Sequence, residues 1–163
     1  TVPGLSVGEN VALGDLGPYV RRGGLALDWQ AVQQHTERAY QSLGLTSPPL
    51  GLPVRALSGG NVQRLVLARE LGLGPKLIVA LYPTRGLDVP TANSAQRALV
   101  AARDAGAGVL LISEDLGELF LLSDRLIVLH RGRVVGEFKP QEVSMSHVGY
   151  LMTGAEVPHG TTL

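Results

Sequence analysis

Apolar runs alternate with amphipathic segments through the second half of this 163-residue chain. Three of the runs are short and almost wholly aliphatic, at residues 77–81, 109–112 and 126–129. Continuous apolar strands are typical of a parallel sheet that is covered on both faces. The segments that follow Pro90 and Asp115 have helical spacing instead. This alternation predicts an α/β fold with right-handed crossovers and a parallel sheet.

The first 72 residues are predicted to be mainly helical. Ser6 and Glu9 have the spacing of a capping box, which predicts a short first helix. A glycine-rich loop is expected at residues 14–24, and a second helix begins near Asp28. Several prolines then keep the chain extended until a third helix, which ends at Gly72.

The last part of the chain is predicted to form a hairpin and a helix. Residues 131–133 make a tight turn, and residues 134–138 return as a strand beside the third apolar run. Ser146 is expected to cap a final helix that reaches Met152. Residues 157–163 are expected to be loose.

Three ring-bearing residues of the second helix are candidates for function. Trp29 and Tyr40 could belong to a contact surface for a partner, but aromatic residues at helical spacing usually pack inward. We therefore expect both in the core. His35 lies between them without a second ligand nearby, so a packed or solvated histidine is expected rather than a metal site.

Composition excludes several classes of protein. Fourteen Lys and Arg residues balance fourteen Asp and Glu residues, so no basic surface indicates a nucleic-acid partner. The chain has no cysteine, which excludes a disulfide scaffold and a thiolate metal site. No apolar run approaches the ~20 residues that span a bilayer, so any membrane association is expected to be through a partner.

The most informative segment is the turn before the third helix, which consists of Leu57, Ser58, Gly59, Gly60 and Asn61. A helix N-terminus carries unpaired N–H donors and a partial positive charge, so it suits an anion such as phosphate. The glycines let a ligand approach the backbone closely. The alternative is that Ser58 only caps the helix and contributes ~1 kcal/mol to its stability.

A second candidate segment, residues 83–88, comes after the first apolar strand. Its sequence is Pro-Thr-Arg-Gly-Leu-Asp, which is typical of a loop. Open α/β sheets place their ligands at the carboxyl ends of their strands. This loop is therefore expected to lie at a ligand-binding edge.

Together these segments resemble ABC-type ATPases. Residues 57–64 resemble the signature motif, in the variant with Asn at its fifth position, and residues 83–88 are similar to the passage from the Walker B strand into the D-loop. Residues 111–118 resemble the switch region, and residues 123–129 the strand after it. Residues 149–154 look like the tail of importer ATPases that carry two nucleotide-binding halves in one chain and serve sugar or nucleoside uptake.

The resemblance implies a partial P-loop NTPase fold with a parallel sheet core, a helical subdomain at the N-terminus and a C-terminal β-hairpin plus helix. It implies three parts: the helical subdomain with the signature helix (1–72), the C-terminal half of the α/β ATPase core (73–139), and a C-terminal helix and tail (140–163). In the resembled family the helical subdomain contacts the membrane-spanning subunits.

A Walker A loop needs a lysine directly after glycine, and neither Lys76 nor Lys139 meets this condition. We therefore expect the chain to be the C-terminal part of the second, degenerate nucleotide-binding half. Such a piece would leave the faces and an edge of its sheet exposed. The isolated chain is then expected to oligomerise or to be poorly soluble.

Three catalytic positions depart from the family pattern. Leu81 stands where the Walker B Asp would hold Mg²⁺ through water, and leucine offers no oxygen ligand. Tyr82 stands where a Glu would activate water, and a phenol is a poor general base at neutral pH. Glu114 stands at the switch His position, where its charge would repel a γ-phosphate. The chain alone is therefore predicted to be inactive and to hold no metal.

In the resembled family the signature acts on ATP that the opposite half holds. Ser58 and the N–H groups of Gly59 and Gly60 would then reach the γ-phosphate across a dimer interface, and Asp88 would help to position that site, unless Asp88 is an ordinary helix cap. The resemblance implies ATP and Mg²⁺ as cofactors, bound mainly by the partner half. It also implies permease subunits and, indirectly, a solute-binding protein as partners, at the cytoplasmic face of the cell membrane.

Two other functions stay open. One is a lobe of a nucleic-acid maintenance ATPase, which has a similar signature, although the neutral charge and the ending around Met152 count against it. The other is a docking module without catalysis. The sequence does not specify the transported solute.

Overall fold

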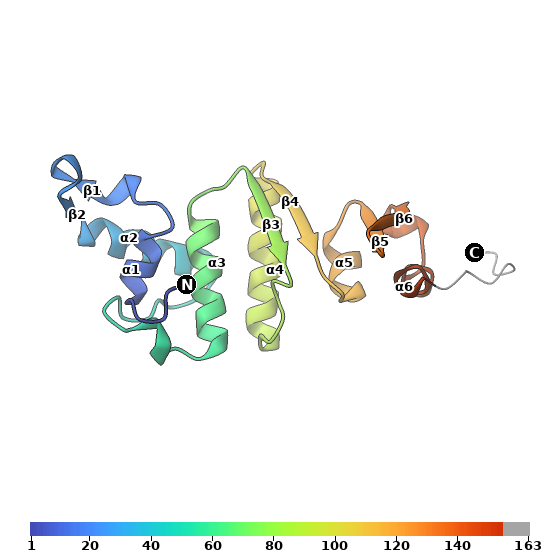
Figure 1. Cartoon of the computed structure of the whole chain (residues 1–163), viewed down its shortest axis with the longest axis horizontal. Coiled ribbons are helices and arrows are strands. Elements are labelled where there is room, and N and C mark those ends of the chain that lie inside the picture. Colours follow the sequence, from blue (N-terminus) through green and yellow to red (C-terminus); the bar gives the residue numbers. More distant parts are fainter. Residues whose placement is uncertain (155–163) are drawn as a thin grey trace, which may run out of the picture. The chain divides into compact units, whose positions relative to one another are not determined.

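The computed structural model describes residues 1–154, apart from the side chain of Arg22 (Figure 1). The predicted loose segment 157–163 lies outside the described residues. The helices are α1 (Val7–Ala12), α2 (Trp29–Ser42), α3 (Gly59–Gly72), α4 (Val89–Asp104), α5 (Leu116–Leu122) and α6 (Met145–Thr153). The strands are β1 (Val20–Arg21), β2 (Ala26–Leu27), β3 (Leu77–Leu81), β4 (Gly108–Ile112), β5 (Leu126–His130) and β6 (Arg133–Phe138). Four 3-10 turns are η1 (Gly17–Tyr19), η2 (Arg22–Gly24), η3 (Val54–Ala56) and η4 (Pro140–Glu142).

The chain forms two compact units, residues 1–110 and residues 111–163. The predicted boundaries at residues 72 and 139 stay a prediction. Within residues 1–154 no helix is both long enough and apolar enough to cross a bilayer.

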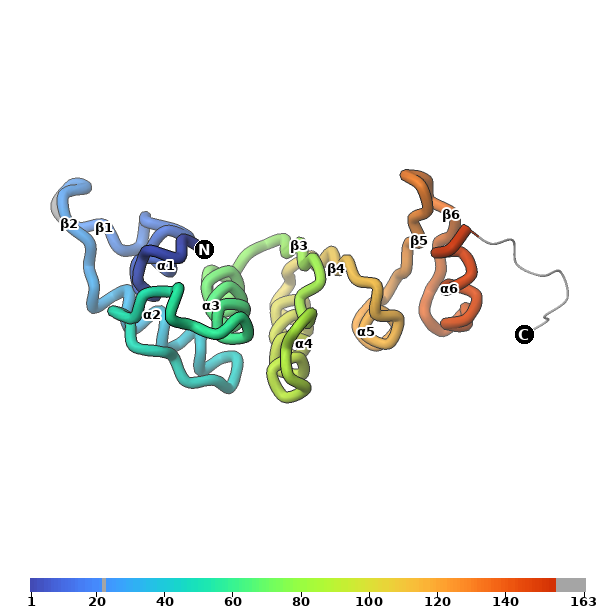
Figure 2. The backbone as a smooth tube through the Cα atoms, turned by 60° about the horizontal axis from the view of Figure 1, so that its bottom comes forward, coloured from blue at the N-terminus to red at the C-terminus, as the bar shows by residue number. Residues whose placement is uncertain are grey.

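Helices α1, α2 and α3 pack against one another in the first unit, and α2 contacts both of the others (Figure 2). Their shared core contains Val7, Val11, Val32, Tyr40 and Leu65. The predicted capping box is confirmed, because the Ser6 hydroxyl accepts from Glu9 N at 3.2 Å and Ser6 N donates to Glu9 Oε2 at 2.7 Å. Burying these side chains in one cluster stabilises the unit through the hydrophobic effect.

The expected loop at 14–24 is wrong in part, because it contains a 3-10 turn and a two-residue strand, β1, that pairs antiparallel with β2. Tyr19 explains this order: its side chain is almost fully buried, and its carbonyl accepts from Asp28 N at 2.7 Å. Strands of two residues have no periodic pattern to detect.

The aromatic residues of α2 behave differently from one another. Tyr40 is buried as predicted, whereas the prediction for Trp29 is wrong, since 48% of this residue is exposed. Trp29 is the first residue of α2, where only part of the ring can reach the core. His35 is packed, with its ring edge-on to Tyr19 at 5.8 Å between centroids, and burial lowers its pKa.

Strand β3 leads through α4 to β4, which lies beside β3 and points the same way (Figure 1). Strand β3 is not covered on both faces as its apolar run alone suggests; the structure instead agrees with the expectation that a partial sheet leaves apolar surface exposed. Leu77, Val79 and Leu81 alternate along the strand and are 60–65% exposed, and Leu110 of β4 is 51% exposed. One side of this short sheet is therefore an open aliphatic face, which we call the β3 face and define by these four residues.

In the second unit β5 pairs antiparallel with β6, as the predicted hairpin requires. The prediction that β5 belongs to the parallel sheet is wrong: β3 and β4 form one two-stranded sheet, and β5 and β6 form another. Arg131 and Gly132 have φ angles of 47° and 76°, which make the two-residue turn between the strands. Because this turn is so short, β5 finds its partner locally.

Helix α6 packs on β5 and β6. Its cap is Ser144, whose hydroxyl accepts from His147 N at 3.2 Å, so the predicted start at Ser146 is two residues late. The buried Val148 explains the difference, because a helix that begins at Met145 already includes a full turn before it.

Candidate functional site

The turn before α3 is at the surface. Ser58 is the N-cap of α3, and its hydroxyl accepts from Asn61 N at 3.3 Å. Ser58, Gly59 and Asn61 are exposed, and Gly60 is half-buried. The serine, the glycines and the first free N–H groups of the helix are therefore accessible to a ligand from outside the chain.

The two glycines have no explanation within the described chain. They are the first residues of α3 and neither has a positive φ, so the backbone conformation does not require glycine at either position. A Cβ at either position would meet nothing within 4 Å. Glycine in a helix is less stable than alanine by up to ~1 kcal/mol. Two adjacent glycines with free space above them favour close approach of another molecule.

The loop after β3 is held against α3. Gln63 donates from Nε2 to the carbonyl of Pro83 at 3.2 Å. Tyr82 adopts a left-handed backbone conformation with φ 48°, which is unusual for a bulky residue, and the Arg85 guanidinium lies 5.5 Å from the centre of its ring. Such a conformation persists only where neighbouring contacts enforce it. The loop is thus fixed by α3 at one end and by its own side chains at the other.

Arg64 links the start of α3 to the start of α4. It donates from Nη1 to Asn61 Oδ1 at 3.3 Å, from Nη2 to Asp88 Oδ2 at 3.1 Å, and from Nε to Thr91 Oγ1 at 3.1 Å. Its Nη2 also contacts the Thr91 hydroxyl. The sequence does not predict this bridge, because Asp88 and Thr91 lie 24 and 27 residues away and no local pattern marks them.

Asp88 has two roles in this arrangement. It is the N-cap of α4, with Oδ1 accepting from Thr91 N at 2.8 Å, and its other oxygen pairs with Arg64. The pKa of its carboxyl lies below the ordinary value, chiefly because of hydrogen bonds to the side chain and backbone of Thr91, with a smaller effect from Arg64. The structure thus shows Asp88 as an ordinary helix cap, one of the two roles expected for it, together with an exposed charge near the turn at residues 57–61.

Leu81, Tyr82 and Glu114 are the three residues that the resemblance pairs with catalytic positions. Leu81 ends β3 with its side chain exposed, and Tyr82 comes next in the strained loop. Glu114 is exposed in the second unit, next to Asp115, the N-cap of α5. Within residues 1–154 no three carboxylate or imidazole side chains cluster as metal ligands. Because neither Leu81 nor Tyr82 offers a carboxylate, the residues at the end of β3 do not fit a Mg²⁺ site of the expected kind.

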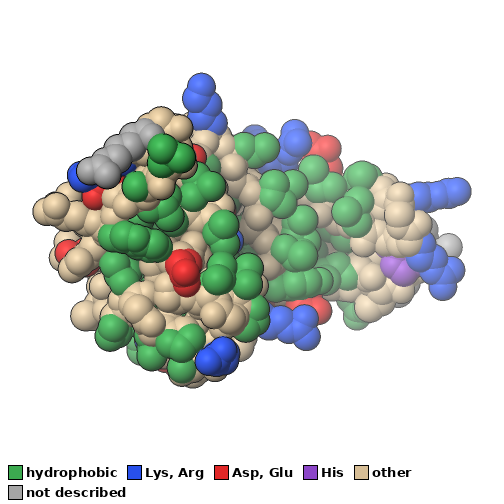
Figure 3. All heavy atoms as spheres, turned by 60° about the vertical axis from the view of Figure 1, so that its left-hand side comes forward, with side chains coloured by type: hydrophobic (Ala, Val, Ile, Leu, Met, Phe, Trp, Pro, Cys, Tyr) green, Lys and Arg blue, Asp and Glu red, His purple; other side chains and the backbone are tan. Residues whose placement is uncertain are grey.

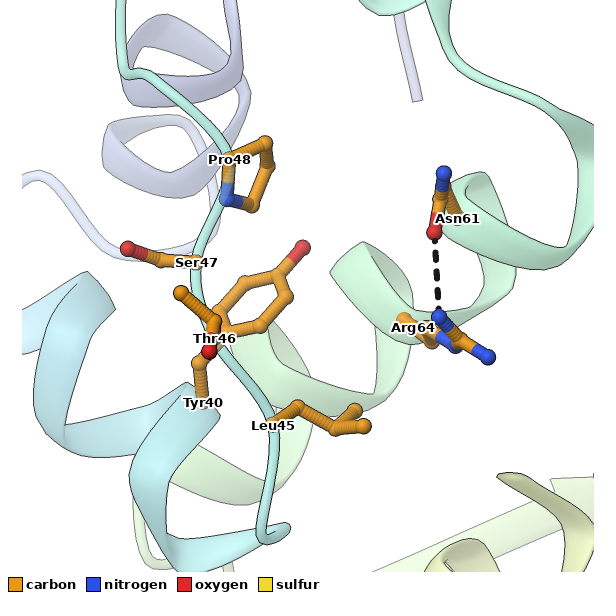
Figure 4. Close-up of a pocket in the computed structure, with 7 residues that line it drawn as sticks. All are labelled: Tyr40, Leu45, Thr46, Ser47, Pro48, Asn61 and Arg64. Carbon is orange, nitrogen blue, oxygen red and sulfur yellow. Dashed lines mark hydrogen bonds between the residues drawn. The ribbon is translucent and has the colours of Figure 1, made fainter. Parts of the chain in front are cut away.

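A pocket of about 380 Å³ lies beside the turn at residues 57–61 (Figure 4). Asn61 and Arg64 lie on one side, and the loop at residues 45–48 lies on the other. The Tyr40 hydroxyl is buried and has no hydrogen-bond partner among the described residues. Burial raises the pKa of Tyr40 to about 12, so this hydroxyl keeps its proton at neutral pH.

Apolar side chains are also present at the molecular surface (Figure 3). In the first unit they include the β3 face, where strands alternate one exposed and one more protected residue. Exposed aliphatic surface of this kind commonly marks a contact with other protein.

The chain is similar to parts of three import ATP-binding proteins. It is 39% identical over 152 residues to the glucose import ATP-binding protein TsgD13 of Haloferax volcanii, which covers 92% of this chain and 28% of that protein. It is 33% identical over 154 residues to the nucleoside import ATP-binding protein NupA of Lactococcus lactis subsp. cremoris, and this match covers 94% of this chain and 30% of that protein. It is 35% identical over 160 residues to the ribose import ATP-binding protein RbsA 1 of Rubrobacter xylanophilus, covering 98% and 32%. The chain thus spans less than a third of the length of these relatives.

Two solved structures of the ATP-binding cassette MJ0796 have a similar fold. A dimeric, post-hydrolysis structure bound to ADP and Pi matches with a TM-score of 0.72 and 26% identity, covering 85% of this chain and 58% of that one. A second dimeric structure matches with a TM-score of 0.71 and 27% identity over the same shares. No family model matches the chain. In sequence the chain is similar to a segment of these import ATP-binding proteins, and in fold it is similar to part of the ATP-binding cassette MJ0796.

Proposed function

We propose that this chain supplies its signature turn to an ATP site whose other residues come from a second nucleotide-binding half. The observation that carries the proposal is that Ser58, an exposed N-cap, precedes two glycines with open space beside them. A Cβ added at Gly59 or Gly60 would have no atom of the chain within 4 Å. A γ-phosphate would receive hydrogen bonds from the Ser58 hydroxyl and from the N–H groups of Gly59 and Gly60. A hydroxyl that accepts one hydrogen bond still has a proton to donate, so the cap and the phosphate contact are compatible.

The same proposal implies that the nucleotide site formed by this half itself does not hydrolyse ATP. Leu81 and Tyr82 offer neither a carboxylate ligand for Mg²⁺ nor an efficient base at neutral pH. An exposed carboxylate such as Glu114 repels a phosphate instead of donating to it. Hydrolysis would then take place at one of two sites, and this segment would contribute to it only in trans.

We further propose an importer of the sugar or nucleoside class as the setting. The support is the similarity to proteins whose names specify glucose, nucleoside and ribose import, together with the ending at residues 149–154. The partners would be the other nucleotide-binding half and the permease subunits, with a solute-binding protein acting through the permease. The segment would lie at the cytoplasmic face of the cell membrane without spanning it.

The test is ATP turnover of the intact ATPase with its permease after Ser58→Arg. A long cationic side chain would fill the open space and remove the hydroxyl. Hydrogen bonds to charged groups contribute about 1.5–3 kcal/mol each, so we expect turnover to fall ten- to a hundredfold or more. Ser144→Arg is the matched control, because Ser144 is also an exposed N-cap serine with the same type of backbone bond. Equal turnover in the Ser58 variant and the parent would refute the proposal.

The open β3 face favours a docking module as the second candidate. In that case Ser58→Arg would leave turnover unchanged, whereas replacement of Val79 with Asp would release a partner protein. A nucleic-acid maintenance ATPase would instead show a nucleotide-dependent shift of DNA in a gel. These outcomes separate the three functions.

A further inference from the structure

We propose that Arg64 is a positioning residue that fixes the signature turn and the Asp88 loop to each other, so that both are presented together to the opposite nucleotide-binding half. This inference rests on the proposed function and goes beyond it. It assigns a role to a residue that would not itself touch the nucleotide.

The geometry of Arg64 suits a bridge. Its guanidinium contacts Asn61 within the first turn of α3, and both Asp88 and Thr91 at the start of α4. A guanidinium is planar and carries five N–H donors in fixed directions, so contacts on both helices restrict their relative position. A lysine ammonium at this place could hold one acceptor well but could not fix both helices.

The bridge is separate from the caps. Ser58 caps α3 through Asn61 N, and Asp88 caps α4 through the oxygen that does not pair with Arg64. Removing the guanidinium therefore leaves both capping bonds in place. A change in activity would then report the relative placement of the two helix starts, and not the loss of either helix end.

Stability alone does not account for the cluster. The Arg64 and Asp88 side chains are 29% and 60% exposed, and ion pairs of this exposure contribute little to folding. Displacing groups near a reaction by about 1 Å, in contrast, can reduce a rate a hundredfold. We therefore expect Arg64 to matter more for turnover than for unfolding.

The first test compares Arg64→Ala and Arg64→Lys in the intact ATPase. We expect kcat to fall about ten- to a hundredfold in Arg64→Ala, with little change in KM for ATP, since the partner half binds the nucleotide. Arg64→Lys should recover part of this loss. Arg97→Ala is the control, because Arg97 is exposed on α4 and donates to Ser94 of the same helix. An Arg64→Ala enzyme with normal kcat would overturn the inference.

The second test measures the distance between the two helix starts and does not depend on ATP turnover. The described chain has no cysteine, so cysteines at the exposed positions Arg55 and Asn93 can carry spin labels before α3 and on α4, in an intact ATPase cleared of other cysteines. Arg64→Ala should broaden the distribution of distances between the labels. Asp88→Asn, which changes the other partner of the same ion pair, should broaden it as well. An unchanged, narrow distribution in both variants would refute the bridge, even if one variant were too unstable for kinetics.

The two proposals can fail separately. If Ser58→Arg lowers turnover while Arg64→Ala changes neither kcat nor the label distances, the inference fails and the proposed function stands. If neither variant lowers turnover, the proposed function fails and the inference fails with it. In the expected case, the loss of turnover in the double variant Arg64→Ala and Asp88→Asn is smaller than the two single losses combined, because both changes remove the same ion pair.

Discussion

Helices α3 and α6 start in the same way and differ in the residues after the cap. Ser58 and Ser144 are both exposed, and their hydroxyls accept from backbone N–H groups at 3.3 and 3.2 Å. After Ser144 come Met145 and Ser146, whereas Ser58 precedes two glycines without close neighbours. Capping thus explains both serines, whereas the glycines are accounted for by the phosphate contact that we propose.

The largest expected effect comes from replacing Gly59 and Gly60 with alanine. Each added methyl meets open space within the chain, so α3 should become more stable by up to ~1 kcal/mol per site. The same methyl groups would obstruct a phosphate, so turnover of the intact ATPase should fall at least about tenfold. The measurements are ATP turnover and amide hydrogen exchange in α3.

Gly149→Ala in α6 is the matched control for this prediction. A Cβ there would lie 3.8 Å from Leu116 Cδ1, an ordinary contact, so the helix should gain stability without any change in turnover. If the Gly59 and Gly60 variants kept full activity, the distinction between the two helix starts would disappear.

A smaller effect is expected at the other end of α3. Gly72 lies against α2, where a Cβ would be 2.9 Å from Ala39 Cβ and 3.0 Å from His35 Nε2. Gly72→Ala should therefore overpack the core and destabilise the first unit by about 1–3 kcal/mol, which denaturant unfolding or hydrogen exchange would measure. Stability equal to that of the parent would show that α2 and α3 are not pressed together there.

The serine caps provide a further comparison. Ser58→Ala and Ser144→Ala should each weaken their own helix by about 1 kcal/mol, as amide exchange in the first turns would show. Only Ser58→Ala should also lower turnover. Equal turnover in the two variants would mean that Ser58 is a cap and nothing more.

The smallest expected effect concerns pH. Hydrogen bonds from Thr91 hold the pKa of Asp88 below its ordinary value of about 3.9. Its ionised form therefore stabilises the folded state at and above that value, and this contribution is lost as pH falls through the lowered pKa. Asp88→Asn should flatten the fall in stability below about pH 4, whereas Ser144→Ala should leave the slope of an acid unfolding curve unchanged.

Local signals predicted much of the fold. The cap at Ser6, the start of a helix near Asp28 and the hairpin turn at residues 131–133 depend on residues within four positions, and the structure confirms them. Ser144 was missed because Ser146 offers the same chemistry two residues later. The burial of Val148 determines which of the two serines caps the helix, and burial depends on tertiary packing.

Only part of the candidate site could be predicted from the sequence. The turn at residues 57–61 and the loop at residues 83–88 were found from motif and composition. The bridge through Arg64 was not, because it depends on how α3 and α4 pack. The open side of β3 was expected only from the missing part of the fold, since an apolar run by itself does not tell which of its residues a neighbour covers.

The aliphatic run of β3 has a consequence for the newly made polypeptide. Five apolar residues without charge are prone to intermolecular β-pairing before folding is complete. Pro75 and Lys76 precede this run, and Pro83 and Arg85 come after it. Proline cannot donate to a neighbouring strand, and cationic side chains repel stacked copies of themselves, so these flanks act as gatekeepers against aggregation during synthesis.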